Sequence, residues 1–169
     1  MRSTRVSHRK QRFMTIADDP KEYKKLTPPE LFHAALQDFA DSVQAKFSRT
    51  GPAEPEDQLR APIEALFETF GRIIGRDLLL TGEPHLRERT GKPDFAAHDQ
   101  KQTIGYMELK APGKGADPAR FKGHDLEQWR RFQSVPNLFY TDGNEWALFR
   151  SGEREGVPVR FLGDVRFDG

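Results

Sequence analysis

The spacing of apolar residues changes near Gly75, and this change constrains the fold more than any other feature of the sequence. Before it, apolar side chains recur every three or four residues in two segments, as on the buried side of a helix. After it, short apolar or alternating runs are separated by turn residues, which is typical of β-strands. This order of elements predicts an α/β or α+β sandwich with a mixed sheet. The expected helices are at 27–47, from 56 to an end near Gly71 or Gly75, and at 121–132. The expected strands are at 77–81, 93–98, 103–110, 135–140 and 145–150, with a strand or a tail after 151.

Length and composition exclude several classes of protein. A chain of 169 residues, of which 31% are charged, has the size and polarity of one soluble domain. It contains no cysteine, which excludes disulfides, thiolate nucleophiles, zinc fingers and iron–sulfur ligation. No apolar run reaches the roughly 18 residues of a membrane span, so we expect a cytoplasmic protein with no membrane contact.

Positive charge gathers at the N-terminus. Residues 1–13 contain five Arg and Lys side chains and no acid, although the whole chain has a net charge of only +1. We expect residues 1–26 to form a flexible basic tail, either a leader without a role or a loose contact for nucleic acid. Residues 27–169 would then form a single domain, with an N-terminal helix at 27–50 and a functional core at 56–150.

Acids and a lysine in two neighbouring strands are the first candidates for chemistry. Alternation places Glu108 and Lys110 on one face of their strand, where the ordinary interpretation is a solvent-exposed ion pair. Asp94 follows a proline at the start of the preceding strand, and a hairpin around 99–101 would bring it close to Glu108. Glu56 falls within the apolar stripe of an upstream helix, so this acid is also expected to face inward.

The pair of acids, Asp94 and Glu108, predicts a metal site. Two carboxylates held close together repel unless a cation lies between them. The natural cation is Mg²⁺, which accepts one or two carboxylates together with water and phosphate oxygens, and Mn²⁺ would substitute for it. A lysine two residues from such an acid can orient or deprotonate a water molecule, or offset charge in the transition state. With Lys110, the two acids therefore indicate hydrolysis of phosphodiesters.

These residues resemble the motif of the PD-(D/E)xK nuclease superfamily, as Pro93-Asp94 followed by Glu108-Leu109-Lys110. The run from Gln128 to Phe132 is similar to the Q-x-x-x-Y helix motif of the RecB-like branch, with phenylalanine in place of tyrosine. The segment 135–149 resembles the closing hairpin of nuclease domains in large restriction enzymes, and the run from Glu56 to Arg60 resembles their E-x-x-x-R opening.

The resemblance implies a restriction-endonuclease-like fold, with a central mixed sheet of four to five strands flanked by helices, and Mg²⁺-dependent hydrolysis of DNA. It implies that Gln128 holds DNA or the geometry of the site, whereas from its position alone a solvent-facing helix residue is the simpler interpretation. The other site residues that it implies are Asp94, Glu108, the Leu109 carbonyl and Glu56 as metal ligands, and Lys110 at the nucleophile.

Cations that follow the strand ending at Lys110 are candidates for DNA contacts. A glycine-rich stretch lets backbone N–H groups approach phosphates, and nearby cations raise affinity in a salt-dependent way. A solvated loop is the alternative. The candidates are Lys114, Arg120, Lys122 and His124.

Three functions fit this pattern of residues. We expect a Mg²⁺-dependent DNA endonuclease domain, the cleavage module of a restriction-modification enzyme, with DNA and the methyltransferase or helicase domains of a larger assembly as partners. One alternative is a DNA-binding or docking module with an idle site, and another is a repair or recombination nuclease. The sequence contains no helix-turn-helix or zinc finger that would read bases, so an isolated module is expected to cut with little sequence choice.

Overall fold

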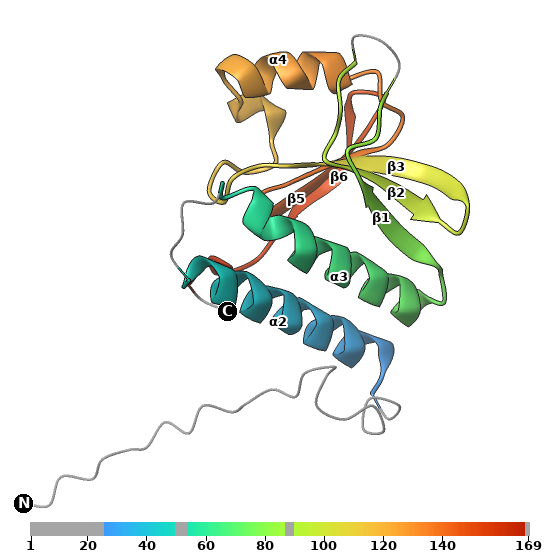
Figure 1. Cartoon of the computed structure of the whole chain (residues 1–169), viewed down its shortest axis with the longest axis vertical. Coiled ribbons are helices and arrows are strands. Elements are labelled where there is room, and N and C mark those ends of the chain that lie inside the picture. Colours follow the sequence, from blue (N-terminus) through green and yellow to red (C-terminus); the bar gives the residue numbers. More distant parts are fainter. Residues whose placement is uncertain (1–25, 50–53, 87–89, 168–169) are drawn as a thin grey trace, which may run out of the picture.

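One mixed β-sheet forms the centre of the protein, with two helices on one face and one helix on the other (Figure 1). The computed structural model describes residues 26–49, 54–86 and 90–167, and residues 1–25 of the expected basic tail lie outside the described residues. The predicted class, α/β (α+β) with a central mixed sheet flanked by helices, is confirmed. The helices are α2 (Pro28–Phe47), α3 (Asp57–Ile74) and α4 (Gly123–Phe132), with a short 3-10 helix η1 (Pro118–Arg120) before α4.

The sheet contains six strands in sequence order, which corrects the expected four to five. The additional strand lies after residue 151, where the sequence allowed a strand or a tail, and it pairs antiparallel with the strand before it. The third and fourth strands are parallel, because the chain crosses over between them through α4, and the other neighbours are antiparallel. The strands are β1 (Leu78–Gly82), β2 (Phe95–Asp99), β3 (Gln102–Leu109), β4 (Leu138–Thr141), β5 (Glu145–Arg150) and β6 (Glu153–Arg160).

Local signals set the ends of α2 and α3. The Thr27 N–H donates to the Glu30 carboxylate at 2.7 Å, so the capping interaction starts α2 where the sequence predicts it. Gly75 ends α3 with a φ of 70°, a backbone conformation that favours glycine. Pro62 is buried inside α3, and the helix continues through it. None of the helices in the described part of the chain is both long and apolar enough to cross a membrane.

Two predicted boundaries are shifted inward. The third helix begins at Gly123 and not at 121, because Phe121 and Lys122 have extended backbone angles. The strand expected from 135 begins at Leu138, because Pro136 has no N–H to donate to a neighbouring strand. Both differences lie at the ends of elements whose type is as predicted.

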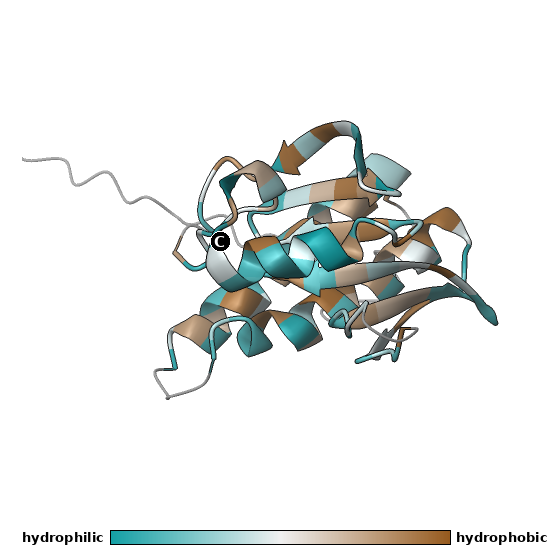
Figure 2. Ribbon diagram, turned by 90° about the horizontal axis from the view of Figure 1, so that it is seen from above, coloured by the Kyte–Doolittle hydropathy of each residue, from teal (hydrophilic) through white to brown (hydrophobic). Residues whose placement is uncertain are grey.

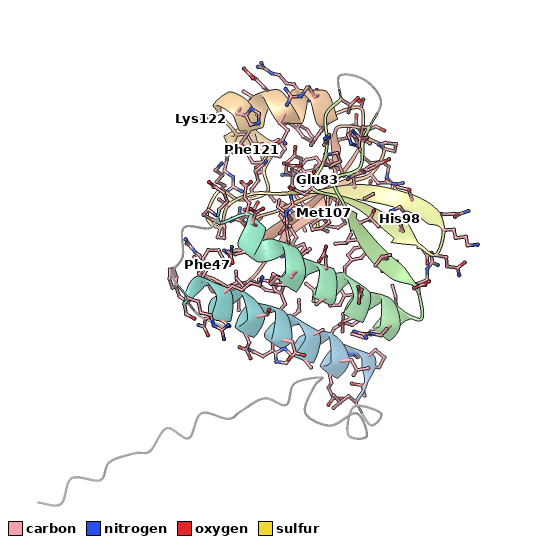
Figure 3. The ribbon with its side chains drawn as sticks, in the orientation of Figure 1. Phe47, Glu83, His98, Met107, Phe121 and Lys122 are labelled. Atoms are coloured by element: carbon pink, nitrogen blue, oxygen red, sulfur yellow. The ribbon has the colours of Figure 1, made fainter. Side chains whose placement is uncertain are left out.

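The two faces of the sheet pack on different helices. Met107 and Leu109 belong to a core cluster with side chains of α2 and α3, whereas the opposite face packs against α4 in a second cluster. Figure 3 shows Met107 between the sheet and α3, and Figure 2 shows hydrophilic and hydrophobic residues mixed along the helices, as expected when one side of each is covered. This confirms the predicted alternation, and it leaves Glu108 and Lys110 on the α4 side.

Candidate active site

The candidate site lies at the end of the sheet where β3 and β4 finish side by side. These strands are parallel, and Leu109 pairs with Thr141 at their last residues. In the β2–β3 hairpin Phe95 pairs with Met107, so Asp94 just before β2 lies across from Glu108. The sequence-predicted hairpin therefore brings the two acids to the same end of the sheet.

Lys110 is buried at this end and is held by neighbours on two elements. Its Nζ lies 2.9 Å from Glu108 Oε1 and 2.7 Å from Gln128 Oε1. The side chains of Lys110 and Glu108 are only 3% and 5% exposed, so the ion pair is not at the surface. The Tyr140 ring adds a cation–π contact, with its centroid 5.8 Å from Nζ. Gln128 thus points from α4 toward the lysine and not into solvent.

Asp94 uses both of its carboxylate oxygens. Oδ2 accepts a hydrogen bond of 2.8 Å from the backbone N–H of Leu109, which fixes the acid against β3. Oδ1 forms a salt bridge with the guanidinium of Arg60 from α3. Burial raises the pKa of Asp94, whereas the Leu109 N–H and Arg60 act in the opposite direction. The acid is therefore held in place by one backbone donor and one cation.

The surroundings raise the pKa of both Glu108 and Lys110, for different reasons. Burial raises the pKa of Glu108 to about 7; Lys110 opposes this shift, and Asp94 adds to it. Burial by itself would lower the pKa of Lys110, but the carboxylate of Glu108 raises it above its ordinary value. Lys110 is therefore an ammonium at neutral pH, and Glu108 is an acid whose charge needs a nearby cation.

Glu56 reaches the same end of the sheet from the N-terminus of α3. Its Oε1 accepts a hydrogen bond of 2.9 Å from the backbone N–H of Ala111, the residue after Lys110. The predicted inward orientation of this acid is thus found in the structure. In this arrangement Glu56 holds the chain that leaves β3.

Asp125 of α4 is a member of the site that the sequence analysis did not single out. Its Oδ1 lies 3.5 Å from Lys110 Nζ, and its Oδ2 lies 3.0 Å from Lys114 Nζ. One carboxylate thus connects the buried lysine with a half-exposed lysine of the following loop. The signal was present in the sequence, because Asp125 precedes Gln128 by three residues and so shares its helix face.

The four candidates for DNA contacts lie in different surroundings in the structure. Lys114 lies next to the site through Asp125, whereas Arg120 binds the buried carboxylate of Glu145 at 2.5 Å. Lys122 and His124 are exposed at the start of α4, and Figure 3 shows Lys122 at the outer end of that helix.

The glycine-rich loop after Lys110 has its backbone donors occupied. The N–H groups of Gly113 and Gly115 donate to Asp142 Oδ2, at 2.9 and 2.7 Å. The other oxygen of Asp142 accepts from the N–H groups of Asn144 and Glu145. These two glycine N–H groups therefore bind an internal carboxylate, and phosphate contacts from this loop would have to come from its side chains.

The donors at the site suit a hard divalent cation. Glu108 Oε2 is buried, and it has no hydrogen-bond partner among the described residues. The adjacent carboxylate of Asp94 and the carbonyl of Leu109 are oxygen donors of the kind that Mg²⁺ prefers. Among residues 26–49, 54–86 and 90–167, no three His, Asp or Glu side chains cluster closely enough to hold a metal by themselves. The possible ligand set is therefore two carboxylates and a backbone carbonyl, which fits an ion that keeps several waters.

Comparison with known proteins supports the fold alone. No family model matches this chain, and no curated protein matches it. Among solved structures, a chain of the cryo-EM structure of a DrdV–DNA complex shares the fold, with a TM-score of 0.56 and 21% sequence identity over 78% of this chain. The similar region makes up 12% of that chain. The fold of this domain thus occurs as a small part of a much longer polypeptide.

Proposed function

We propose that this chain is a Mg²⁺-dependent DNA endonuclease domain of the PD-(D/E)xK type, with Mn²⁺ able to replace Mg²⁺. The observation that carries the proposal is the buried oxygen Glu108 Oε2, which has no hydrogen-bond partner in the described part of the chain and lies beside Asp94 and Lys110. A buried carboxylate oxygen without a donor is costly, and a bound cation would remove that cost.

The residues at the site have distinct roles in this proposal. Asp94, Glu108 and the Leu109 carbonyl would hold the ion, and Glu56 would contribute through a water molecule. When bound, the ion supplies a water of lowered pKa and positive charge for the phosphate oxygens. The Lys110 ammonium would donate its remaining hydrogen, the one nearest Asp125, to the attacking water or to the developing negative charge, and Gln128 fixes its direction.

DNA is the substrate that we propose. The solved structure that shares this fold is, by its title, a complex with DNA. Lys114, Lys122 and His124 supply side chains for phosphates near the site. Because the fold makes up 12% of the DrdV chain, we propose that this domain works as the cleavage module of a larger restriction-modification assembly with methyltransferase or helicase parts.

Nicking of supercoiled plasmid tests the proposed function. Purified protein is incubated with plasmid and Mg²⁺ or Mn²⁺, with and without EDTA, beside the variants Asp94→Asn and Lys110→Met. Glu127→Gln is the matched control, because Glu127 is exposed on α4 next to Gln128. We expect metal-dependent nicking by the wild type and the control, and none by the two site variants. Binding of DNA without metal-dependent nicking at high protein concentration would favour the docking module.

A further inference from the structure

The Arg60 side chain extends from α3 to the site and contacts both the carboxylate and the backbone carbonyl of Asp94. Its guanidinium forms a salt bridge with Asp94 Oδ1 and donates a hydrogen bond of 3.3 Å to the Asp94 carbonyl. The Nε donates to Asp57 Oδ1 at 3.2 Å, and the guanidinium carbon lies 5.2 Å from the centroid of the Phe95 ring. Four contacts with three residues thus set the position of this cation, whose side chain is 29% exposed.

Each of the two acids proposed to hold the ion is paired with a cation of the protein itself. Arg60 neutralises Asp94, and Lys110 neutralises Glu108. Asp94 raises the pKa of Glu108, but less than burial does. In the absence of a metal, these two cations therefore do what a single divalent ion would do between the two acids.

Only one of these two cations belongs to the proposed reaction. Lys110 has a role beside the nucleophile, whereas Arg60 lies on the α3 side of Asp94 and contacts no other member of the proposed ligand set. The Arg60 guanidinium beside Asp94 Oδ1 makes that oxygen a weaker electron donor, and it also repels a second cation. Arg60 is thus placed to oppose the ion that Asp94 is proposed to bind.

We propose that Arg60 is the resident counter-cation of Asp94, a positioning residue that stabilises the metal-free site and competes with the divalent ion for this carboxylate. The inference rests on the proposed function, because it assumes that Asp94 binds the ion. It goes beyond the proposed function because it states that Arg60 controls how tightly the site binds the metal. A merely structural role for Arg60 predicts that its removal weakens folding and metal binding together, whereas competition predicts that the two change in opposite directions.

The test measures metal affinity and stability in the same set of full-chain variants. Arg60→Gln keeps a hydrogen-bond donor and removes the charge; Arg60→Lys keeps the charge; Arg60→Met removes both and keeps apolar contact with Phe95. Arg72→Gln is the matched control, because Arg72 is on the same helix and bonds only to Thr69 among the hydrogen bonds found for its side chain in the described residues. Mn²⁺ binding is measured by isothermal titration calorimetry, and thermal unfolding is followed in EDTA by circular dichroism.

We expect Arg60→Gln to unfold at a lower temperature in EDTA and to bind Mn²⁺ on the order of tenfold more tightly than the wild type. Arg60→Lys and Arg72→Gln should bind Mn²⁺ with wild-type affinity. Arg60→Met should behave like Arg60→Gln, so the test remains decisive if one of these two charge-removing variants fails to fold. Equal or weaker Mn²⁺ binding by the folded charge-removing variants overturns the inference alone. Absence of Mn²⁺ binding by the wild type overturns the proposed metal site as well, so the two failures are distinguishable.

Discussion

The amide oxygen of Gln128 accepts a hydrogen bond of 2.7 Å from Lys110 Nζ, which joins α4 to the end of β3 across 18 residues of sequence. Because an ammonium has three donors, Glu108 and Gln128 take two of them and Asp125 lies near the third. Lys110 is thus fixed in direction by the helix of the crossover that connects β3 to β4. The position of α4 is for this reason part of the site.

Removal of the Gln128 acceptor should reduce turnover more than substrate binding. Gln128→Leu leaves Lys110 less firmly directed, so we expect single-turnover cleavage to slow by about tenfold or more, with the Kd for DNA changed by less than about twofold. Gln128→Glu should retain more activity, because it preserves an acceptor. Equal losses in Gln128→Leu and in the exposed control Glu127→Leu would show that the helix, and not the acceptor, matters.

Glu108 and Lys110 should be strongly coupled in stability. Lys110→Met alone leaves a buried carboxylate without its cation, which we expect to cost about 3–5 kcal/mol of unfolding free energy. Glu108→Gln combined with Lys110→Met should recover part of this loss, giving a coupling energy of about 1–3 kcal/mol in a double-mutant cycle measured by urea unfolding. Additive effects of the two substitutions would mean that the pair is not formed in solution.

The stability of the metal-free protein should fall as pH rises toward neutrality. Burial raises the pKa of Glu108 from 4.5 to about 7, so the folded protein holds this proton more tightly than the unfolded chain does. The resulting stability is fully present below pH 4.5 and is lost as pH rises through about 7, and its size is on the order of 3 kcal/mol. Thermal unfolding in EDTA from pH 4 to 8 should show this slope in the wild type, and a flatter profile in Glu108→Gln.

Asp142 should be essential for the loop that follows the active strand. Its two oxygens accept four backbone N–H groups, two from the loop and two from the β4–β5 turn. We expect Asp142→Ala to lower the unfolding free energy by about 2–4 kcal/mol, because these buried donors lose an ionised acceptor. Asp142→Asn, which keeps one acceptor oxygen, should lose less. The check is urea unfolding of the three proteins, and a change below about 0.5 kcal/mol in Asp142→Ala would contradict this role.

Exposed cations near α4 should contribute to DNA binding through salt-dependent contacts. Lys122→Ala is expected to reduce the slope of log K against log salt by about one contact. Arg120→Ala should change this slope less, because Glu145 already binds its guanidinium, but it should lower stability. Lys101→Ala, in the exposed turn between β2 and β3, is the control. Fluorescence anisotropy at several salt concentrations measures the slopes; equal slopes for Lys122→Ala and Lys101→Ala would remove Lys122 from the interface.

The period of the apolar residues was sufficient to predict the type of nearly every element. Capping at Thr27 gave the start of α2, and glycines gave two possible ends for α3, Gly71 and Gly75, of which the structure uses the left-handed Gly75. These signals act over one helical turn. The β2–β3 hairpin followed from alternation and a turn, and with it the proximity of Asp94 and Glu108. These features depend on local geometry that neighbouring residues determine.

Relationships between distant segments were much harder to predict. The burial of the Glu108–Lys110 pair depends on the packing of α4 over β3, which alternation within one strand does not reveal. The occupation of the glycine N–H groups by Asp142 likewise requires the parallel pairing of β3 and β4. Arg60 was visible as the end of an E-x-x-x-R run and Asp125 as a residue on the helix face of Gln128, but their partners became clear only once the helices were docked on the sheet.

The most direct test of the proposed site is the position of a bound metal. A crystal of the wild-type protein grown with Mn²⁺ is measured at a wavelength where manganese scatters anomalously, beside a crystal of Glu108→Gln treated in the same way. We expect one strong anomalous peak within coordination distance of Glu108 Oε2, an Asp94 oxygen and the Leu109 carbonyl, and a weaker or absent peak in the variant. A fully occupied Mn²⁺ elsewhere, with none between these two acids, would contradict the proposal that Asp94 and Glu108 hold the catalytic ion.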